Sequence, residues 1–254
     1  MLYYYKILYT GYNSGRFTIV RNNFFKKRTY NSTEGDDMEN KTVASNQYEL
    51  DFLNALLDGN RSLTLEITEN YLLNGNNIMD LYENVLKSSL YKVGILWEKN
   101  KISVATEHLA SALVETLLNE IHPRLDFKGK KGYKVLLSCV ENEYHQIGIK
   151  MVSDIFESNG WKTYFLGANT PTNELVSFAS EIKPDILAIS MSIYFHFPNF
   201  EKMINTIKNE IPDQKILVGG QAFSRGGVDY LSKYENVVYL PDLKSIETYL
   251  ANFN

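Results

Sequence analysis

Apolar residues recur at helical spacing between residues 46 and 122. Four such stripes occupy residues 50–57, 63–72, 78–97 and 104–118, and short polar stretches separate them. Side chains three and four positions apart lie on one face of a helix, so each stripe predicts a helix with one buried face. Helices joined by short loops pack against their neighbours in antiparallel pairs. The pattern therefore predicts an all-α four-helix bundle over residues 46–125.

The pattern changes to strand–helix alternation from residue 132 onward. Short apolar runs at residues 133–140, 161–166, 186–191, 216–218 and 237–240 are each followed by an amphipathic stretch. Five such units are typical of an α/β fold, in which helices cover both faces of a parallel sheet. We therefore predict that residues 126–254 form a five-stranded, doubly wound, flavodoxin-like sheet. In this architecture ligands bind beyond the carboxyl ends of the strands.

The composition is that of an ordinary globular protein, with 44% hydrophobic and 22% charged residues among 254. The one cysteine, Cys139, excludes an intrachain disulfide and a CxxC metal or redox site, which favours a cytoplasmic protein. No apolar stretch reaches the ~18 residues of a membrane span, so we predict no membrane association. The net charge of −4 does not suggest a chain built mainly to hold nucleic-acid phosphates.

Residues 1–45 differ from the rest of the chain in charge. They hold seven basic and four acidic residues, which leaves residues 46–254 with a net charge of −7. Aromatic residues are also frequent among the first thirty positions. A basic aromatic arm can contact nucleic acid or a partner protein, but a poorly ordered N-terminal extension explains the same composition. We predict such an extension.

Polar residues follow the first predicted strand, where a ligand would bind. Glu143, His145 and Gly148 form the pattern E-x-H-x-x-G, and the apolar period of a helix restarts directly after it. A carboxylate two residues from an imidazole can orient it and raise its basicity, as happens around metal-ligating histidines. No glycine-rich phosphate-binding motif follows this strand. An exposed histidine near a helix start is the alternative interpretation.

The ends of two further strands add to this pattern. The third strand ends in Ser190 and Ser192, and the fourth ends in Gly219 and Gly220. Bare glycine backbone permits a ligand to approach closely. Taken in order along the chain, E-x-H-x-x-G, S-x-S and GG resemble the signature of base-off/His-on cobalamin-binding domains.

The predicted bundle extends this resemblance. Residues 96–98 read LWE and residues 102–111 read ISVATEHLAS. These runs are similar to the pattern of the four-helix cap in light-responsive, adenosylcobalamin-binding transcription regulators. The resemblance covers about residues 46–250. Glu98 departs from it, because some of these regulators carry a histidine there that ligates cobalt after illumination.

The resemblance implies a role for each residue of the strand-end motifs. His145 would be the lower axial ligand of cobalt, Glu143 would orient its imidazole, and Gly148 would allow close packing beside the corrin ring. The channel for the released nucleotide tail would be lined by Ser190, Ser192, Gly219 and Gly220.

The resemblance also implies that the bundle caps the upper face of the cofactor. Val104, Glu107 and His108 fall at positions i, i+3 and i+4, so one helix face can present all three. Trp97 and Val104 would supply apolar contact, and Glu107 would hydrogen-bond an adenosyl sugar. Adenosylcobalamin is therefore a better match than methylcobalamin. An ordinary bundle core is the alternative for the Trp97 and Val104 stripe.

Three functions are compatible with these motifs. The first is a cobalamin-dependent sensor, in which loss or photolysis of the upper ligand shifts the cap and alters an assembly. The second is a corrinoid carrier subunit that delivers methyl groups to methyltransferase partners, and the third is a degenerate domain that binds no cofactor. The light-responsive regulators carry a DNA-binding winged helix ahead of the bundle, whereas residues 1–45 show no recognition helix. We therefore expect action through a protein partner rather than direct DNA binding, and the sequence leaves homo-oligomer formation open.

Overall fold

The computed structural model describes residues 37–253, with side chains from residue 47 onward. The predicted extension falls almost entirely outside these residues. The first helix, α1 (Asp37–Leu57), begins within the stretch that the sequence assigned to the extension. Apolar periodicity gives no signal for the polar turns that precede the buried stripe, so the helix is longer than predicted. Across the described part of the chain, no helix combines the length and the apolar character needed to cross a membrane.

The helical cap contains the four predicted helices. They are α1, α2 (Arg61–Leu73), a third helix made of α3 (Ile78–Leu81), η1 (Tyr82–Lys87) and α4 (Ser88–Glu98), and α5 (Val104–Ile121). The η1 segment is a π-helical stretch within the continuous third helix. Asn60, Asn77 and Ser103 in the polar breaks are N-caps, and each side chain accepts a hydrogen bond from a backbone N–H three residues on. The short polar stretches between the helices therefore supply the N-cap of the following helix as well as ending the preceding one.

The second half of the chain forms the predicted parallel sheet. Its strands are β1 (Lys134–Cys139), β2 (Lys162–Gly167), β3 (Ile186–Ser190), β4 (Ile216–Gly219) and β5 (Val237–Tyr239). They are all parallel and lie in the order β2-β1-β3-β4-β5. This is the flavodoxin-like order, in which β2 is added on one side of β1 and the later strands are added on the other side, so the strand order switches between β1 and β3. The predicted fold class is confirmed.

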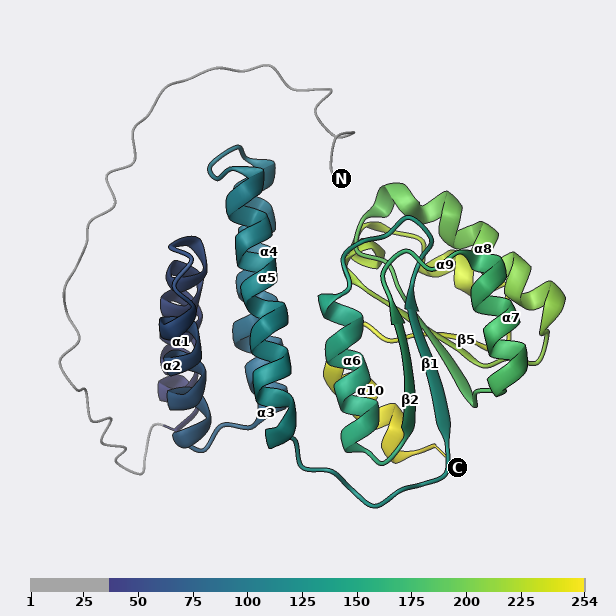
Figure 1. Cartoon of the computed structure of the whole chain (residues 1–254), viewed down its shortest axis with the longest axis horizontal. Coiled ribbons are helices and arrows are strands. Elements are labelled where there is room, and N and C mark those ends of the chain that lie inside the picture. Colours follow the sequence, from purple (N-terminus) through teal and green to yellow (C-terminus); the bar gives the residue numbers. More distant parts are fainter. Residues whose placement is uncertain (1–36, 254) are drawn as a thin grey trace. The chain divides into compact units, whose positions relative to one another are not determined.

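Helices cover both faces of this sheet (Figure 1). On one face lie α6 (Ile147–Ser158) and α10 (Leu243–Ala251), and on the other lie α7 (Thr172–Ile182), α8 (Phe197–Glu210) and α9 (Val228–Leu231). Each face has its own hydrophobic cluster. The cluster beneath α6 and α10 also includes the buried residues of the cap. The cap and the sheet domain therefore share one core.

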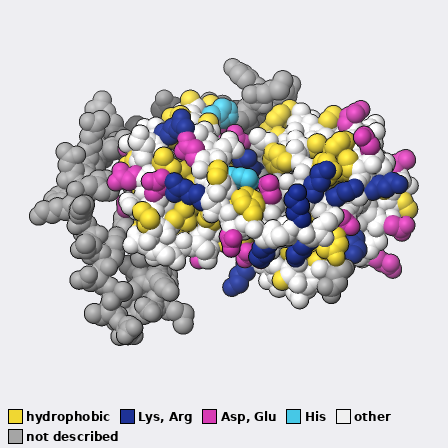
Figure 2. All heavy atoms as spheres, turned by 60° about the horizontal axis from the view of Figure 1, so that its bottom comes forward, with side chains coloured by type: hydrophobic (Ala, Val, Ile, Leu, Met, Phe, Trp, Pro, Cys, Tyr) yellow, Lys and Arg dark blue, Asp and Glu magenta, His cyan; other side chains and the backbone are white. Residues whose placement is uncertain are grey.

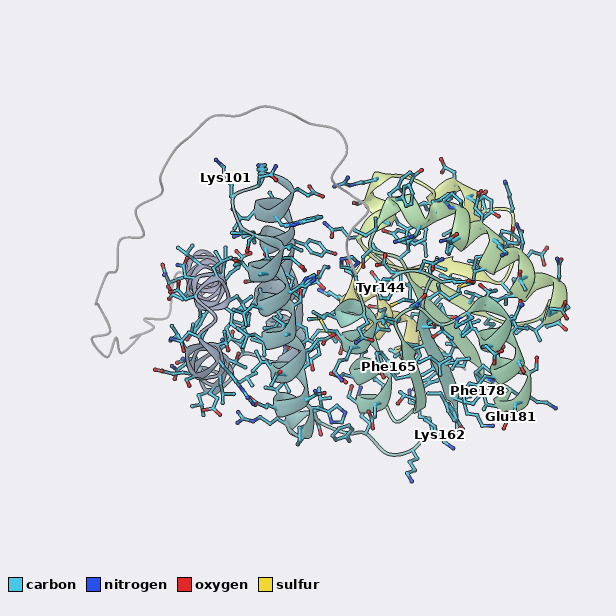
Figure 3. All side chains as sticks on the ribbon, turned by 45° about the horizontal axis from the view of Figure 1, so that its top comes forward. Lys101, Tyr144, Lys162, Phe165, Phe178 and Glu181 are labelled. Carbon is cyan, nitrogen blue, oxygen red and sulfur yellow. The ribbon has the colours of Figure 1, made fainter. Side chains whose placement is uncertain are left out.

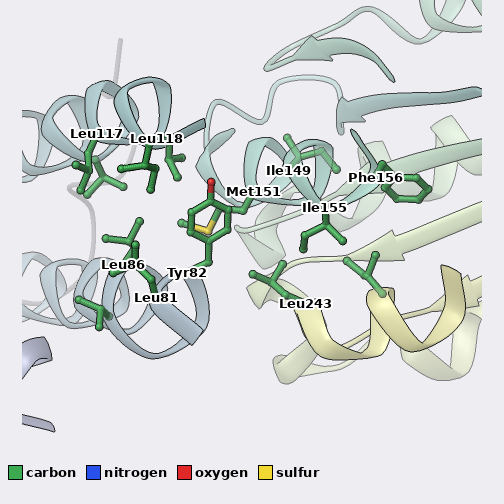
Figure 4. Packing of buried hydrophobic residues seen from close by; sticks show 14 of the residues in the cluster. Leu81, Tyr82, Leu86, Leu117, Leu118, Ile149, Met151, Ile155, Phe156 and Leu243 are labelled. Atoms are coloured by element: carbon green, nitrogen blue, oxygen red, sulfur yellow. The ribbon is translucent and has the colours of Figure 1, made fainter. Parts of the chain in front are cut away.

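One buried polar contact lies within this shared core. Tyr82 of the cap is 1% exposed, and its hydroxyl donates a 2.7 Å hydrogen bond to Oδ2 of Asp154 on α6. Figure 4 shows Tyr82 beside Met151 of α6, between the cap helices and the sheet domain. Burial raises the pKa of Asp154 and outweighs the hydrogen bond from Tyr82, which lowers it. Both polar groups are buried, and each would lose its hydrogen-bond partner if the cap moved away from α6. The contact therefore fixes the cap on α6.

We expect Tyr82→Phe to lower the free energy of unfolding by about 1–3 kcal/mol, because it takes a hydrogen-bond donor away from a buried carboxyl group. Urea unfolding of the purified chain measures this change. The matched control is Tyr249→Phe on α10, which we expect to change the free energy of unfolding by less than about 0.5 kcal/mol. Equal effects of the two substitutions would contradict the assigned role of the hydrogen bond.

Candidate functional site

The loop after β1 places His145 at the carboxyl edge of the sheet. Cys139 and Val140 are fully buried, and Val140 N–H donates to the carbonyl of Ser190 on the neighbouring strand. Helix α6 begins two residues after His145. The histidine therefore stands between a buried central strand and a helix, at the switch point where this fold binds ligands.

The carboxylate of Glu143 is fully buried and holds this loop together. Its Oε1 accepts hydrogen bonds from Nδ1 and from the backbone N–H of His145. Its Oε2 accepts from the backbone N–H groups of Ser192 and Ile193, at 3.0 and 2.9 Å. Both oxygens are thus satisfied, which a buried charge requires. Glu143 ties the His145 loop to the chain that follows β3.

The electrostatics of the pair favour the charged forms of both groups, a carboxylate beside a protonated imidazole. Burial raises the pKa of Glu143, but hydrogen bonds and the charge of His145 outweigh it, so its pKa is lowered. The hydrogen bond to Glu143 raises the pKa of His145 against the effect of burial, and the charge of Glu107 on the cap adds to the rise. Because a carboxylate only accepts, Nδ1 of His145 carries the proton. Nε2 is then the nitrogen that can bind a metal, once it has released its own proton.

The predicted serine and glycine residues meet at the ends of β3 and β4. Ser190 and Gly219 are directly paired in the sheet register. Ser192 contributes its backbone N–H to Glu143, a role that the sequence motif does not reveal. Gly220 has φ +110°, and a Cβ there would lie 2.2 Å from the carbonyl oxygen of Met191. The backbone itself therefore requires glycine at this position.

Gly148 lies in the first turn of α6 in a different environment. A Cβ there would meet no atom within 4 Å, and the residue is exposed. The described chain therefore does not need glycine at this position for its own packing. The role beside a corrin ring that the resemblance implies remains a prediction.

The predicted cap residues lie on α4 and at the start of α5. Trp97 is partly buried, and Val104 is 44% exposed. Glu107 Oε2 accepts from Nδ1 of His108 at 2.6 Å, and its Oε1 accepts from Oγ of Ser111 at 3.0 Å. Glu107 thus forms hydrogen bonds within its own helix, and the sugar contact that the resemblance implies remains a prediction. His108 is left half exposed, in a Glu–His pair like that of the sheet edge.

Histidine side chains reach the surface on the face shown in Figure 2.

Beyond the end of α4, Lys101 marks the turn into α5 in Figure 3. Beside this turn, Glu98 Oε1 lies 3.6 Å from Nη2 of Arg225, which follows β4 in a 3₁₀ segment (Gln221–Arg225). The residue that departs from the cap pattern therefore forms an ion pair with the sheet domain.

Sequence analysis missed several residues that shape the His145 loop. Asn169, which follows β2, accepts from the backbone N–H of Asn142 at 3.0 Å and donates from its own N–H to the carbonyl of Glu143 at 2.9 Å. Both asparagines have positive φ. Gln146 links the same loop to Glu115 of the cap and to the backbone after β2. The sequence did hold a signal for these turns, an Asn two or three residues after the end of β1 and of β2. Asn adopts the left-handed backbone region more readily than most residues, so an Asn at such a place indicates a tight turn.

The site's composition fits a ligand that needs one imidazole and a polar channel. His145 offers an oriented nitrogen, and its side chain is 45% exposed. The strand ends beside it carry small residues, of which Ser190 is buried, Gly219 is partly buried and Gly220 is exposed. A single imidazole would suit a metal that another group already holds, because the described residues contain no cluster of three or more His, Cys, Asp or Glu side chains able to hold a metal ion by themselves.

Comparisons with known proteins agree with this geometry. Residues 133–240 and residues 49–121 each match a family model described as a B12 binding domain. The chain is 32% identical over 90 residues to the HTH-type transcriptional repressor CarA of Myxococcus xanthus, covering 35% of this chain and 31% of the repressor. It is 24% identical over 182 residues to a corrinoid protein of Desulfitobacterium hafniense, covering 69% of this chain and 84% of that protein. The chain thus spans about a third of the repressor and most of the corrinoid protein.

The fold also matches a solved structure. The Methanosarcina barkeri monomethylamine corrinoid protein superposes with a TM-score of 0.70 at 17% identity, covering 82% of this chain and all of that one. At 17% identity the match supports the fold alone, which is a helical cap followed by a parallel sheet.

We expect Gly220→Ala to lower the free energy of unfolding by at least about 2 kcal/mol, because it places a side chain at positive φ against the backbone of Met191. Denaturant unfolding measures the loss. Gly148→Ala is the matched control, and we expect its free energy of unfolding to be unchanged or raised by up to about 1 kcal/mol. A tolerated Gly220→Ala would show that the β4 end is not held as described.

Proposed function

Two B12 binding domains make this chain a member of the cobalamin-binding protein family, and on that premise we propose that it senses an alkylcobalamin. In this proposal the cofactor is adenosylcobalamin, bound base-off/His-on between the cap and the sheet. The cap residues would respond to loss of the cofactor's upper ligand, by light or by chemistry, and would so change how the protein assembles with a partner. The cofactor supplies a cobalt–carbon bond that can be broken, and the chain supplies binding and orientation.

His145 is the residue that we assign to cobalt. Its Nδ1 is engaged by Glu143, and its side chain is half exposed, which leaves Nε2 free to coordinate. A hydrogen bond from the second ring nitrogen to a carboxylate is how proteins orient metal-ligating histidines. Ser190, Gly219 and Gly220 lie on the neighbouring strand ends and would line the channel for the nucleotide tail.

The observation that favours a sensor is the Glu107–His108–Ser111 cluster at the start of α5. These three side chains are joined by hydrogen bonds on one helix face, and the sequence around them resembles the cap of light-responsive regulators. The similarity to the repressor of Myxococcus xanthus supports the same assignment. Trp97 and Val104 would contact the upper ligand from this cap.

A corrinoid carrier in a methyltransferase system is the second candidate. The observation that favours it is the extent of the similarity, because 69% of this chain aligns with a corrinoid protein and 35% aligns with the repressor. A carrier would bind methylcobalamin and present its upper face to a methyltransferase partner. The two candidates share His145 and differ in how the cap meets the upper ligand.

The experiment that separates them uses two cofactors and light. The chain is purified in the dark with adenosylcobalamin or methylcobalamin, its visible spectrum is recorded, and its oligomeric state is measured before and after illumination. A change of size that depends on light and on adenosylcobalamin supports the sensor. Retention of methylcobalamin without any response to light supports the carrier. Retention of neither cofactor would remove both candidates.

We expect His145→Ala to abolish the His-on spectrum, because the loop after β1 then offers no imidazole to cobalt. Absorbance spectroscopy of the cobalamin complex measures this loss. His122→Ala is the matched control, since the imidazole of His122 lies 3.0 Å from Glu157 Oε2 near the end of the cap, and it should keep the spectrum. An unchanged spectrum in the His145 variant would refute the ligand assignment.

A further inference from the structure

We propose that Gln146 is a positioning residue that couples the cap to the His145 loop. The inference rests on the proposed function, because cobalamin is the group that His145 would hold. Gln146 directly follows His145, and its backbone carbonyl accepts the hydrogen bond from Lys150 N–H that opens α6. Any shift of Gln146 is therefore passed through the backbone to the histidine.

The side-chain amide of Gln146 bridges two separate elements. Its Nε2 donates a 3.0 Å hydrogen bond to Oε1 of Glu115, which lies in the middle of cap helix α5. Its Oε1 accepts a 3.1 Å hydrogen bond from the backbone N–H of Ala168, directly after β2. One side chain thus joins the cap, the His145 loop and the end of an edge strand.

The side-chain amide of Gln146 lies directly against Gly167, where a larger residue would not fit. Gly167 has φ +72°, and a Cβ there would lie 2.5 Å from Oε1 of Gln146. Glycine at this position therefore allows the oxygen to reach the Ala168 N–H. Because the Glu115 carboxylate can only accept and Ala168 N–H can only donate, an amide in this orientation satisfies both partners, whereas a carboxylate or an alkyl group does not.

The contact gives the cap a direct effect on the histidine. On the inner side, Glu143 fixes His145 to the chain after β3. On the outer side, Gln146 fixes the same loop to α5. A displacement of α5 removes the outer bond and loosens the loop, and a shift of the loop in turn weakens the hold on the cap. This reciprocity is a property of any two coupled sites.

Amide and carboxylate can be exchanged to test the coupling. In Gln146→Glu, two carboxylates face each other and the bond is lost. In Glu115→Gln, the new amide oxygen still accepts from Gln146 Nε2, so the bond survives. In the double exchange, the new amide on α5 donates to the new carboxylate on the loop, which also accepts from Ala168 N–H. The bridge is then restored with its direction reversed.

Two measurements are made on the four full-length chains. Urea unfolding without cofactor reports the bridge alone, and titration with hydroxocobalamin followed by absorbance reports affinity and the fraction of His-on complex. We expect Gln146→Glu to bind hydroxocobalamin about tenfold more weakly with a smaller His-on fraction, as loss of one charge-assisted hydrogen bond produces. The Glu115→Gln chain and the double exchange should stay within about threefold of the parent, a range typical of retained contacts.

The outcomes separate the coupling from the function on which it rests. Gln146→Glu could lower the free energy of unfolding while leaving the affinity for hydroxocobalamin and the His-on fraction unchanged. That result would show a purely structural bridge and overturn the positioning role. Failure of the double exchange to restore either measurement would also overturn it. If the parent chain binds no hydroxocobalamin, the proposed function fails and the role of Gln146 fails with it, a result distinct from equal binding by all four chains.

Discussion

A single buried carboxylate, that of Glu143, organises the candidate site at the carboxyl edge of the sheet. Glu143 is fully enclosed, and a charge in that position is tolerated because its two oxygens meet donors from the loops after β1 and β3. The hydrogen bonds to the Glu143 carboxylate hold these two loops and the imidazole of His145 in fixed positions relative to one another. The strand ends beside Glu143 are held together by the sheet itself, in which Ser190 is paired with both Cys139 and Gly219.

The cap is attached by interactions of two different kinds. A continuous hydrophobic core and the Tyr82–Asp154 hydrogen bond join it to α6 away from solvent. Towards the site the joining contacts are polar and partly exposed, namely Gln146 with Glu115 and Glu98 with Arg225. Buried contacts resist opening, whereas exposed ion pairs contribute little free energy. The cap is therefore held to α6 by buried contacts and beside His145 by polar contacts, of which the Glu98–Arg225 ion pair contributes little.

Sequence alone predicted the strands to within a residue or two, because a central parallel strand is buried on both faces and reads as an uninterrupted apolar run. It also placed Glu143 and His145 together, since their spacing along one loop is local. It did not reveal Gln146 or Asn169, whose partners lie more than twenty residues away. Nor did it show that Ser192 acts through its backbone, because a hydrogen bond from N–H leaves no trace in residue type.

The π-helical segment in the third cap helix has a consequence for the direction of every side chain beyond it. An α-helix turns about 100° per residue, and a π-helical stretch accommodates an extra residue without breaking the helix. Tyr82 at the start of this segment contacts α6, while Trp97 lies about four turns later in the same helix, near the other end of the cap. The direction in which Trp97 points therefore depends on the number of residues wound into η1. Removing one residue from this segment would rotate Trp97 about the helix axis while leaving Tyr82 on Asp154, so η1 sets the direction of the α4 side chains relative to the contact with α6.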